Sequence, residues 1–249
     1  MRGKRNRDEL DRDFNGRKGE DMAKRQNKTK TISSANIGQA QRVGIFGASG
    51  CGKTTKARAL IRNLNRIVFF EPLADDLRRL QEQDGFKVVV GLPELFRQIR
   101  LRFNKGFKLG YYPSAGEEEK ELADLANFLM TIQSGFGFSH SAHITLVVDE
   151  LDLSFPTGAS LRNPKNGFKN LCCRGRHTGV HILGLSQRMH LIDNVFRANC
   201  SAVHLFRHSE LADIDVGLKI IGREYKETFR NLDNFQYVYK QGNKIFVKA

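Results

Sequence analysis

The sequence predicts an α/β fold in which helices cover a mostly parallel sheet. Two observations carry this prediction. From Arg42 onward, short apolar runs alternate with amphipathic helical patterns, and a glycine-rich turn joins the first apolar run to the first helix. Repeated strand and helix units of this kind form parallel sheets with both faces covered. A chain of 249 residues is long enough for one such domain with appendages and too short for two.

Six apolar segments have the length and composition of strands, and the last residues, FQYVYKQGNKIFVKA, have the pattern of a β-hairpin that turns near Gly242. The segment ITLVVDE is typical of a buried strand, and it ends in two carboxylates. The expected strands cover residues 43–46, 66–71, 107–112, 144–150, 180–185 and 202–206.

Helical patterns stand between these strands. Pro93 lies near the start of one of them, where its fixed φ suits the first helical turn. Ser114, followed three residues later by Glu117, resembles a capping box at the start of another. The predicted inward-facing residues are Ala57, Leu60, Ile61 and Leu64 in the first helix, Leu95, Phe96, Ile99 and Phe103 after Pro93, and Leu122, Leu125, Ala126 and Leu129 after Ser114.

The chain is strongly basic, with a formal net charge of +14 and a pI near 9.8. Residues 1–35 form a predicted disordered basic arm and linker that carries a net charge of +5, which leaves +9 on residues 36–249. This balance favours a polyanionic partner, either nucleic acid or an anionic membrane surface. No run reaches the roughly 18 apolar residues of a membrane span, and the amino terminus lacks the apolar core of a signal peptide. We therefore expect a cytoplasmic location.

The stretch GASGCGKT satisfies the pattern G-x-x-x-x-G-K-[ST] and has the required strand before it and helix after it. Its glycines let backbone N–H groups wrap phosphates, and the helix N-terminus adds a positive end. Lys53 reaches the β- and γ-phosphate oxygens, and Thr54 ligates Mg²⁺. The sequence therefore predicts a nucleoside triphosphate site with ATP and Mg²⁺, formed by Gly47, Ala48, Ser49, Gly50, Cys51, Gly52, Lys53, Thr54 and Thr55.

The second motif is the pair Asp149 and Glu150 at the end of LVVDE. A carboxylate placed beside the phosphate-binding loop by a core strand can hold the Mg²⁺ shell, which is the role expected of Asp149. The next carboxylate, Glu150, can orient and polarise the attacking water, a task that phosphoryl-transfer hydrolases must assign to some residue. Asp152 is a weaker candidate, expected to be a helix cap or a surface residue.

The third motif is RGRHTGVHILGLSQR, in which two arginines precede a buried strand and Ser186 and Gln187 follow it. Gln187 is expected to emerge at the strand end where the phosphates lie, and there it can sense the γ-phosphate or position water. Arg174 and Arg176 stand near the other end of the strand and are too far away to serve the same nucleotide. They could serve a neighbouring subunit's nucleotide as arginine fingers, bind DNA, or simply hydrate a loop.

These three motifs, followed by RANCSAVHLFR, resemble the FtsK/HerA superfamily of DNA-pumping ATPases. In particular, they resemble the small genome-packaging ATPases of tailless, membrane-containing double-stranded DNA viruses. The resemblance covers roughly residues 41–208. It implies a RecA-like P-loop NTPase of the additional-strand, catalytic-glutamate type, a ring oligomer that is commonly a hexamer, and hydrolysis coupled to the movement of double-stranded DNA.

By motif position, the resemblance assigns Lys53 and Thr54 to nucleotide and Mg²⁺, Asp149 to Mg²⁺, and Glu150 to water activation. It also assigns Gln187 to sensing, and Arg174 or Arg176 to the finger supplied in trans. For a packaging ATPase it implies pumping into a procapsid, with capsid vertex or viral membrane proteins as further partners and a location in the host cytoplasm or with the virion. The basic arm has no assigned counterpart in the family.

A DNA-translocating ring needs basic side chains facing the polyanion. The loop-like stretch SFPTGASLRNPKNGFKN is equally compatible with a pore loop and with an ordinary surface loop. Candidate DNA-facing residues there and in the preceding helix are Arg97, Arg100, Arg102, Lys105, Arg162, Lys165 and Lys169.

Three other functions remain open. A host or plasmid DNA translocase of the same superfamily would share the motor chemistry. A P-loop small-molecule kinase would also show strand and helix alternation, but it leaves the charge of +14 unexplained. An ATP-switched DNA-binding or scaffold protein would hydrolyse ATP slowly and without movement.

Overall fold

The computed structural model describes residues 41–74, 76–133, 143–163 and 165–248, and the predicted arm of residues 1–35 lies outside them. The strands are β1 (Arg42–Phe46), β2 (Arg66–Phe70), β3 (Lys87–Val89), β4 (Phe107–Tyr111), β5 (Ile144–Val148), β6 (Val180–Ser186), β7 (Ala202–Phe206), β8 (Tyr237–Gln241) and β9 (Lys244–Lys248). The helices are α2 (Lys53–Ile61), α3 (Leu77–Asp84), α4 (Leu92–Arg102), α5 (Glu118–Gln133), α6 (Leu151–Ser154), α7 (Ala159–Arg162), α8 (Gly167–Arg174), α9 (Asn194–Asn199), α10 (Leu211–Ile221) and α11 (Lys226–Arg230).

The described strands form one nine-stranded sheet in the order β3-β4-β2-β5-β6-β1-β7-β8-β9. The pairs from β3 to β7 are parallel, and β8 and β9 add an antiparallel hairpin. Strand β6 lies between β1 and β5. The prediction of a mostly parallel α/β sheet with a carboxyl-terminal β-hairpin is therefore confirmed.

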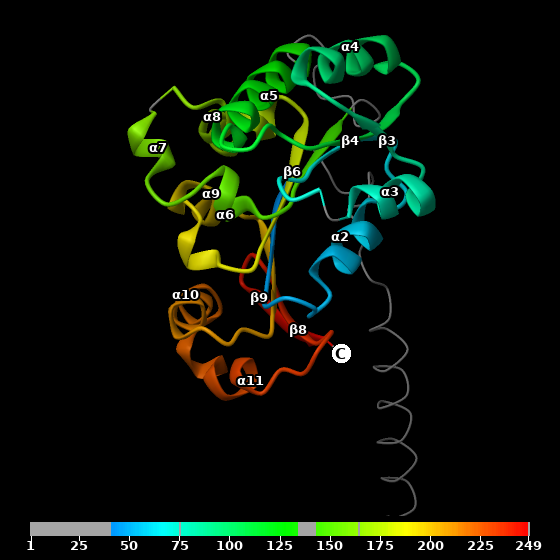
Figure 1. Cartoon of the computed structure of the whole chain (residues 1–249). Coiled ribbons are helices and arrows are strands. Elements are labelled where there is room, and N and C mark those ends of the chain that lie inside the picture. Colours follow the sequence, from blue (N-terminus) through cyan, green and yellow to red (C-terminus); the bar gives the residue numbers. More distant parts are fainter. Residues whose placement is uncertain (1–40, 75, 134–142, 164, 249) are drawn as a thin grey trace, which may run out of the picture. The chain divides into compact units, whose positions relative to one another are not determined.

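Helices α2 and α3 lie on one side of the sheet, and α5, α8 and α9 lie on the other (Figure 1). Right-handed crossovers require this division, because the connections through α2 and α3 run toward the β3 edge whereas the later ones run back toward β7. Strand β1 stands where these two directions separate, and such a switch point leaves a crevice at the carboxyl ends of the strands.

Six strands were predictable because their residues are apolar and mostly buried, as the five buried residues of β1 and of β5 illustrate. The hairpin is largely exposed or half-buried, and it was predictable from two strand patterns separated by a turn near Gly242. Strand β3 and helix α3 were missed. Only Val89 of β3 is buried, since this strand is three residues long and forms the sheet edge. Among the described residues, no helix is both long enough and apolar enough to cross a bilayer.

The predicted capping box at Ser114 is wrong in its details. Helix α5 begins at Glu118 rather than directly after Ser114. The Glu117 N–H donates to the Ser114 backbone carbonyl at 2.9 Å, so it does not meet the hydroxyl. The reciprocal contact comes from Glu121, whose Oε2 accepts from the Ser114 N–H at 3.3 Å and from the Tyr111 hydroxyl at 2.5 Å. Because Glu121 is held by the Tyr111 hydroxyl, Glu121 rather than Glu117 makes the side-chain contact with the Ser114 backbone.

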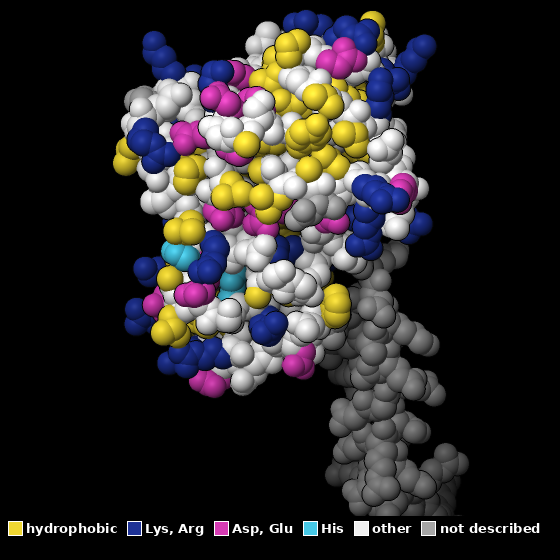
Figure 2. All heavy atoms as spheres, in the orientation of Figure 1, with side chains coloured by type: hydrophobic (Ala, Val, Ile, Leu, Met, Phe, Trp, Pro, Cys, Tyr) yellow, Lys and Arg dark blue, Asp and Glu magenta, His cyan; other side chains and the backbone are white. Residues whose placement is uncertain are grey.

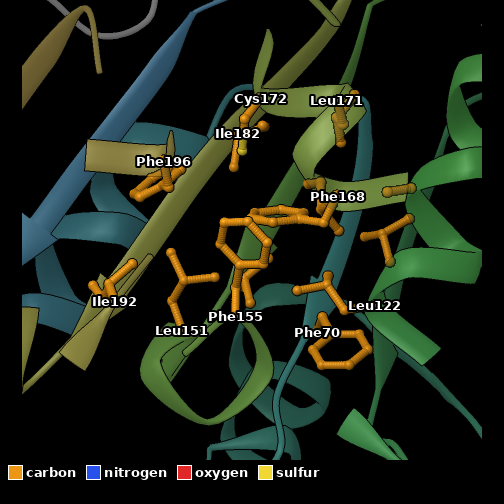
Figure 3. Packing of buried hydrophobic residues seen from close by; sticks show 14 of the residues in the cluster. Phe70, Leu122, Leu151, Phe155, Phe168, Leu171, Cys172, Ile182, Ile192 and Phe196 are labelled. Atoms are coloured by element: carbon orange, nitrogen blue, oxygen red, sulfur yellow. The ribbon is translucent and has the colours of Figure 1, made fainter. Parts of the chain in front are cut away.

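The loop-like interpretation of residues 154–170 is also wrong. This stretch contains α7 and the start of α8, and its Phe155 and Phe168 are fully buried. Figure 3 shows these two rings packed together between Leu151 and Leu122, and their centroids lie 5.0 Å apart. A Cβ on Gly167 would lie 2.0 Å from the Ala123 carbonyl oxygen of α5. Both ends of the stretch are therefore anchored in the core, whereas Leu161, Arg162, Asn163 and Lys165 between them are exposed.

Candidate nucleotide-binding and hydrolysis site

The glycine-rich loop follows β1 and begins between the ends of its two neighbouring strands. The Gly47 N–H donates to the Ser186 carbonyl of β6 at 3.2 Å, and the Ala48 N–H donates to the Arg207 carbonyl just after β7 at 2.8 Å. These two bonds fix where the loop leaves the sheet. Helix α2 then begins at Lys53, so its N-terminal N–H groups lie at the end of the loop.

The loop has the backbone conformation that its glycines predict. Gly50 and Gly52 have φ values of 71° and 103°, which side chains disfavour. The Lys53 ammonium donates to the Ala48 carbonyl at 3.1 Å and so folds across the loop. Cys51 is fully buried, and burial raises the pKa of its thiol. Cys51 therefore acts as a small packed residue.

Asp149 directly follows β5 and points into an acidic group beside the loop. It is 7% exposed, and burial raises its pKa to about 6 although the Glu150 N–H and the Lys53 ammonium both favour its charged form. One carboxylate oxygen from each of Glu71, Asp76 and Asp149 lies within 4.8 Å of the others. Glu71 follows β2, the strand paired with β5, so the sheet brings these groups together.

These residues fit Mg²⁺. Hard divalent cations prefer carboxylate, hydroxyl and water oxygens, and a buried carboxylate with a raised pKa is stabilised in its charged form by a nearby cation. Thr54 in the first turn of α2 is half-buried and offers the hydroxyl. Glu71 and Asp76 were not among the predicted site residues. The ending of RIVFFE in a carboxylate, the same pattern as in LVVDE, was the signal for Glu71.

Glu150 lies beside this group in a strained backbone conformation. Its φ of 41° and ψ of 56° are left-handed, which is uncommon for a residue with a side chain. The Glu150 N–H donates to Asp149 Oδ1 at 2.9 Å, and Glu150 Oε1 accepts from Gln187 Nε2 at 2.5 Å. Gln187 follows β6 and is half-buried, so it emerges at the same edge of the sheet as the glycine-rich loop.

The expectation that Asp152 is a helix cap or a surface residue is wrong. Glu150 occupies the cap position of α6, and Asp152 is half-buried in its first turn. Its Oδ1 accepts from the Ser186 hydroxyl at 2.6 Å, and the same hydroxyl accepts from the Arg188 N–H at 2.9 Å. Asp152 therefore holds the ends of β5 and β6 together, which supports the contact between Glu150 and Gln187.

Arg174 and Arg176 lie away from this group, at the amino-terminal end of β6. Arg174 ends α8, Arg176 lies in the 3₁₀ turn Gly175–His177, and both side chains are exposed. Burial lowers the pKa of Arg42 at the start of β1, and the charge of Arg176 adds to this lowering. Both arginines therefore stand at the opposite end of the sheet from the glycine-rich loop of the same chain.

The candidate DNA-facing residues lie on helices α4, α7 and α8, except Lys105 and Lys165, which lie in turns after α4 and before α8. Two of them are ion-paired, Arg97 with Glu94 at 2.6 Å and Arg162 with Glu119 at 2.8 Å. Arg102 Nε donates to Gln98, the Arg100 guanidinium lies 5.0 Å above the Phe128 ring, and the Lys169 ammonium donates to the Ser160 carbonyl. Lys105 and Lys165 are exposed and have no carboxylate partner among the described residues.

Figure 2 shows how charge is distributed over one face of the molecule. Hydrophobic side chains gather in its upper part, whereas Lys and Arg side chains lie along the margins and in the lower half. The basic side chains of this face are therefore spread out and form no single patch.

A polar pocket adjoins the glycine-rich loop between the segments that follow β6 and β7. It is lined by Ala48, Ser49, Gln187, Arg188, His208, Ser209, Glu210 and Asp213. Burial lowers the pKa of His208 to about 4, so its imidazole is neutral at pH 7. Asp213 accepts from the His190 N–H and contacts the His190 ring, both at 2.9 Å. Sequence reasoning missed this pocket because His208, Ser209, Glu210 and Asp213, which complete it beside the loop and Gln187, belong to no recognised motif.

Residues 43–208 match the family model described as ATPase family associated with various cellular activities (AAA). No curated protein sequence matches the chain significantly.

Solved structures resemble the chain over most of its length. B204, the DNA-packaging ATPase from Sulfolobus turreted icosahedral virus, is 15% identical with a TM-score of 0.64, over 86% of this chain and 98% of that chain. The genome packaging NTPase B204 from Sulfolobus turreted icosahedral virus 2, in complex with ATP-gammaS, is 12% identical with a TM-score of 0.65, over 84% and 97%. VirB4 of Thermoanaerobacter pseudethanolicus is 10% identical with a TM-score of 0.58, over 86% and 90%. The prediction of a P-loop ATPase with the fold of viral packaging ATPases is therefore confirmed.

Proposed function

Because the chain belongs to the ATPase family associated with various cellular activities (AAA), we propose that it uses ATP hydrolysis to move double-stranded DNA through a ring of identical subunits, as a viral genome-packaging motor. The observation that carries this proposal is the likeness to the packaging NTPases, which covers 84–86% of this chain and 97–98% of theirs. The net charge of +9 on residues 36–249 favours binding to a polyanion such as DNA. Contacts to DNA phosphates are independent of sequence, so they allow the DNA to slide past the protein.

The proposed hydrolysis assigns a task to each residue of the site. The backbone N–H groups of residues 47–55 bind the phosphates, and the Lys53 ammonium turns from the Ala48 carbonyl to the β- and γ-phosphate oxygens. Thr54 and Asp149 hold Mg²⁺ with support from Glu71 and Asp76. Bound there, Mg²⁺ neutralises charge on the β- and γ-phosphates.

Glu150 is the proposed general base. Its carboxylate accepts a proton from the water that attacks the γ-phosphate, the bond from the γ-phosphorus to the bridging oxygen breaks, and ADP and phosphate result. Gln187 Nε2 holds one carboxylate oxygen of Glu150 and leaves the other for the water. Gln187 is a positioning residue in this account. Because it links Glu150 to the end of β6, a shift of β6 would also move the base, which is how Gln187 would couple the γ-phosphate to the rest of the sheet.

Arg174 and Arg176 are proposed to act in trans. Both side chains are exposed at the amino-terminal end of β6, the opposite end of that strand from the chain's own loop, which supports a contact with a neighbouring subunit's nucleotide. In a ring, the amino-terminal edge of one sheet can approach the carboxyl-terminal edge of the next, and an arginine supplied there stabilises the charge of the transition state. The hexamer is the ring size that the resemblance favours.

A cellular DNA translocase is the second candidate. The likeness to VirB4 from a bacterium favours it, since that chain is matched over 90% of its length. The two candidates share the motor and differ in the partner that anchors it, which is a capsid vertex or viral membrane protein for the packaging motor.

The test is ATP hydrolysis by the purified chain without nucleic acid, with double-stranded DNA and with single-stranded DNA, over a salt series. We expect double-stranded DNA to stimulate hydrolysis and salt to abolish the stimulation. Lys53→Ala is the control for contaminating activity. Hydrolysis that is indifferent to DNA would contradict the proposal, and transfer of phosphate to a small molecule would indicate a kinase.

A further inference from the structure

An exposed aromatic ring stands directly over the glycine-rich loop. Phe235 precedes β8, and its side chain is 63% exposed. Its φ of 70° is left-handed, a conformation that costs of order 1 kcal/mol or more for a bulky residue. A ring that only filled space would gain little from such a position, because most of its surface stays in water.

The surrounding segment fixes the position of this ring. The Phe235 N–H donates to the Cys51 carbonyl inside the loop at 3.2 Å. A Cβ on Gly52 would lie 2.9 Å from Phe235 Cδ1, so the glycine allows the ring to approach the loop backbone closely. Asn234 accepts from Arg207 Nε at 3.3 Å, which ties the segment to the end of β7.

A turn holds the segment from the other side. The Gln236 N–H donates to the Asp233 carbonyl at 3.2 Å, and the Gln236 side chain accepts from the Asp233 N–H at 3.1 Å. Tyr237 then receives a hydrogen bond of 2.8 Å from Lys56 of α2. Phe235 is therefore held against both the loop and the helix that follows it.

The sheet order places Phe235 opposite the hydrolytic group. Asp149 and Gln187 follow β5 and β6, which lie on one side of β1, whereas Phe235 precedes β8 on the other side. A triphosphate that lies along the loop with its γ-phosphate toward Asp149 leaves its nucleoside on the β7 and β8 side. An exposed aromatic ring at that end offers a flat apolar face to a nucleobase.

We propose that Phe235 is the stacking surface for the nucleobase of the bound nucleotide. This proposal rests on the proposed ATPase function and names a residue at the far end of the same site. Stacking uses the face of the base, which every base possesses. Phe235 therefore binds ATP and GTP alike, and it contributes nothing to the binding of a triphosphate that carries no base.

The chain contains no Trp, so Phe235→Trp introduces a single fluorescent reporter at this position. We would titrate Phe235→Trp with ATP, GTP and inorganic tripolyphosphate, each with Mg²⁺. The matched control is Phe246→Trp, since Phe246 is an exposed aromatic residue on β9. Calorimetry on Phe235→Ala gives the affinity without a reporter.

We expect ATP and GTP to quench Trp at position 235, tripolyphosphate to leave it unquenched, and Trp at position 246 to respond to none of them. Phe235→Ala is expected to bind ATP about tenfold more weakly and tripolyphosphate as before. Unchanged ATP affinity in Phe235→Ala, or equal quenching by ATP and tripolyphosphate, would overturn the stacking and leave the ATPase intact. A wild-type chain that binds neither ligand would refute the ATPase function itself, and the stacking with it.

Discussion

The side-chain amide of Gln187 donates a 2.5 Å hydrogen bond to the carboxylate of Glu150, and this bond joins the ends of β6 and β5. Strands β5 and β6 are paired in the sheet, so two motifs 37 residues apart in the sequence meet at one point beside the glycine-rich loop. The bond occupies one oxygen of Glu150, which leaves the other oxygen for a water. Mutation of each residue therefore tests a different role, the general base for Glu150 and the positioning of that base for Gln187.

Glu150→Gln is expected to lower the ATP turnover rate at least about 100-fold, because an amide cannot accept the proton of the attacking water. The affinity for ATP should change little, since Glu150 is not among the phosphate ligands. Single-turnover hydrolysis and calorimetric ATP binding measure the two quantities. Glu227→Gln is the control on an exposed part of α11, and normal turnover in Glu150→Gln would remove the catalytic assignment.

Gln187→Ala is expected to lower turnover by roughly tenfold with unchanged ATP affinity, because Glu150 keeps its carboxylate but loses its orientation. Turnover measured against pH distinguishes positioning from a general loss of structure. If Gln187 only positions Glu150, the turnover rate should be lower at every pH, and its dependence on pH should keep the same shape. If Gln187→Ala instead weakens ATP binding as much as turnover, the residue contacts the nucleotide rather than Glu150.

Asp149→Asn is expected to stabilise the protein when metal and nucleotide are absent. The folded-state pKa of about 6 lies above the ordinary value of an aspartate, 3.8, so at pH 8 folding buries a charge that the unfolded chain exposes. The variant should raise the free energy of unfolding by roughly 2 kcal/mol at pH 8. As pH falls from about 6 toward 4, the folded carboxyl takes up its proton first, and the advantage of the variant should shrink.

Urea unfolding at pH 8 and at pH 4.5 measures this difference. Asp215→Asn on the exposed side of α10 is the control, with no expected change at either pH. An Asp149→Asn variant that is less stable than the wild type at pH 8 would show that the charge of Asp149 is satisfied within the apo protein. The requirement for a cation at this position would then lose its support.

Mixed rings test the arginines in trans. Lys53→Ala removes a subunit's own nucleotide site but keeps its arginines. Arg176→Ala keeps the nucleotide site but removes the arginine. If Arg176 acts on a neighbour, mixing the two inactive proteins should restore part of the activity, because some sites then face an intact arginine. Arg174→Ala is tested in the same way. The absence of recovery at every ratio, in samples where native mass spectrometry detects mixed rings, would contradict the trans role.

The salt dependence of DNA binding separates the basic candidates. Lys165 has no carboxylate partner among the described residues, whereas Arg162 is paired with Glu119. If Lys165 contacts a phosphate, Lys165→Gln should reduce the slope of log Kd against log salt by about one. Arg162→Gln should change it less, since its charge is already neutralised. Equal slopes for Lys165→Gln and the wild type would remove Lys165 from the DNA-facing set.

The sequence predicted the parts of the site that local patterns encode. Gly50 and Gly52 have the left-handed conformations that the loop motif requires, and the hydrophobic strand before Asp149 brings it to the sheet edge. Gln187 was predictable from its place after β6. These residues share one feature, which is that a buried strand next to them in the chain determines their position.

The remaining residues of the site depend on the strand order. Glu71 meets Asp149 only because β2 pairs with β5, and Phe235 reaches Gly52 only because the segment before β8 folds back over the loop. The core packing at the two ends of residues 154–170 was missed for a similar reason. Their polar composition and prolines resemble a loop, but Phe155 and Phe168 attach the stretch to the core.

The most direct test of the account is the displacement of a third strand from a DNA triplex, which reports movement of a motor along double-stranded DNA. We predict that the wild-type chain displaces the strand in the presence of ATP and Mg²⁺, and that Lys53→Ala and Glu150→Gln do not. DNA-stimulated hydrolysis without displacement, under conditions where rings are present, would contradict translocation and would identify the chain as an ATP-driven switch on DNA.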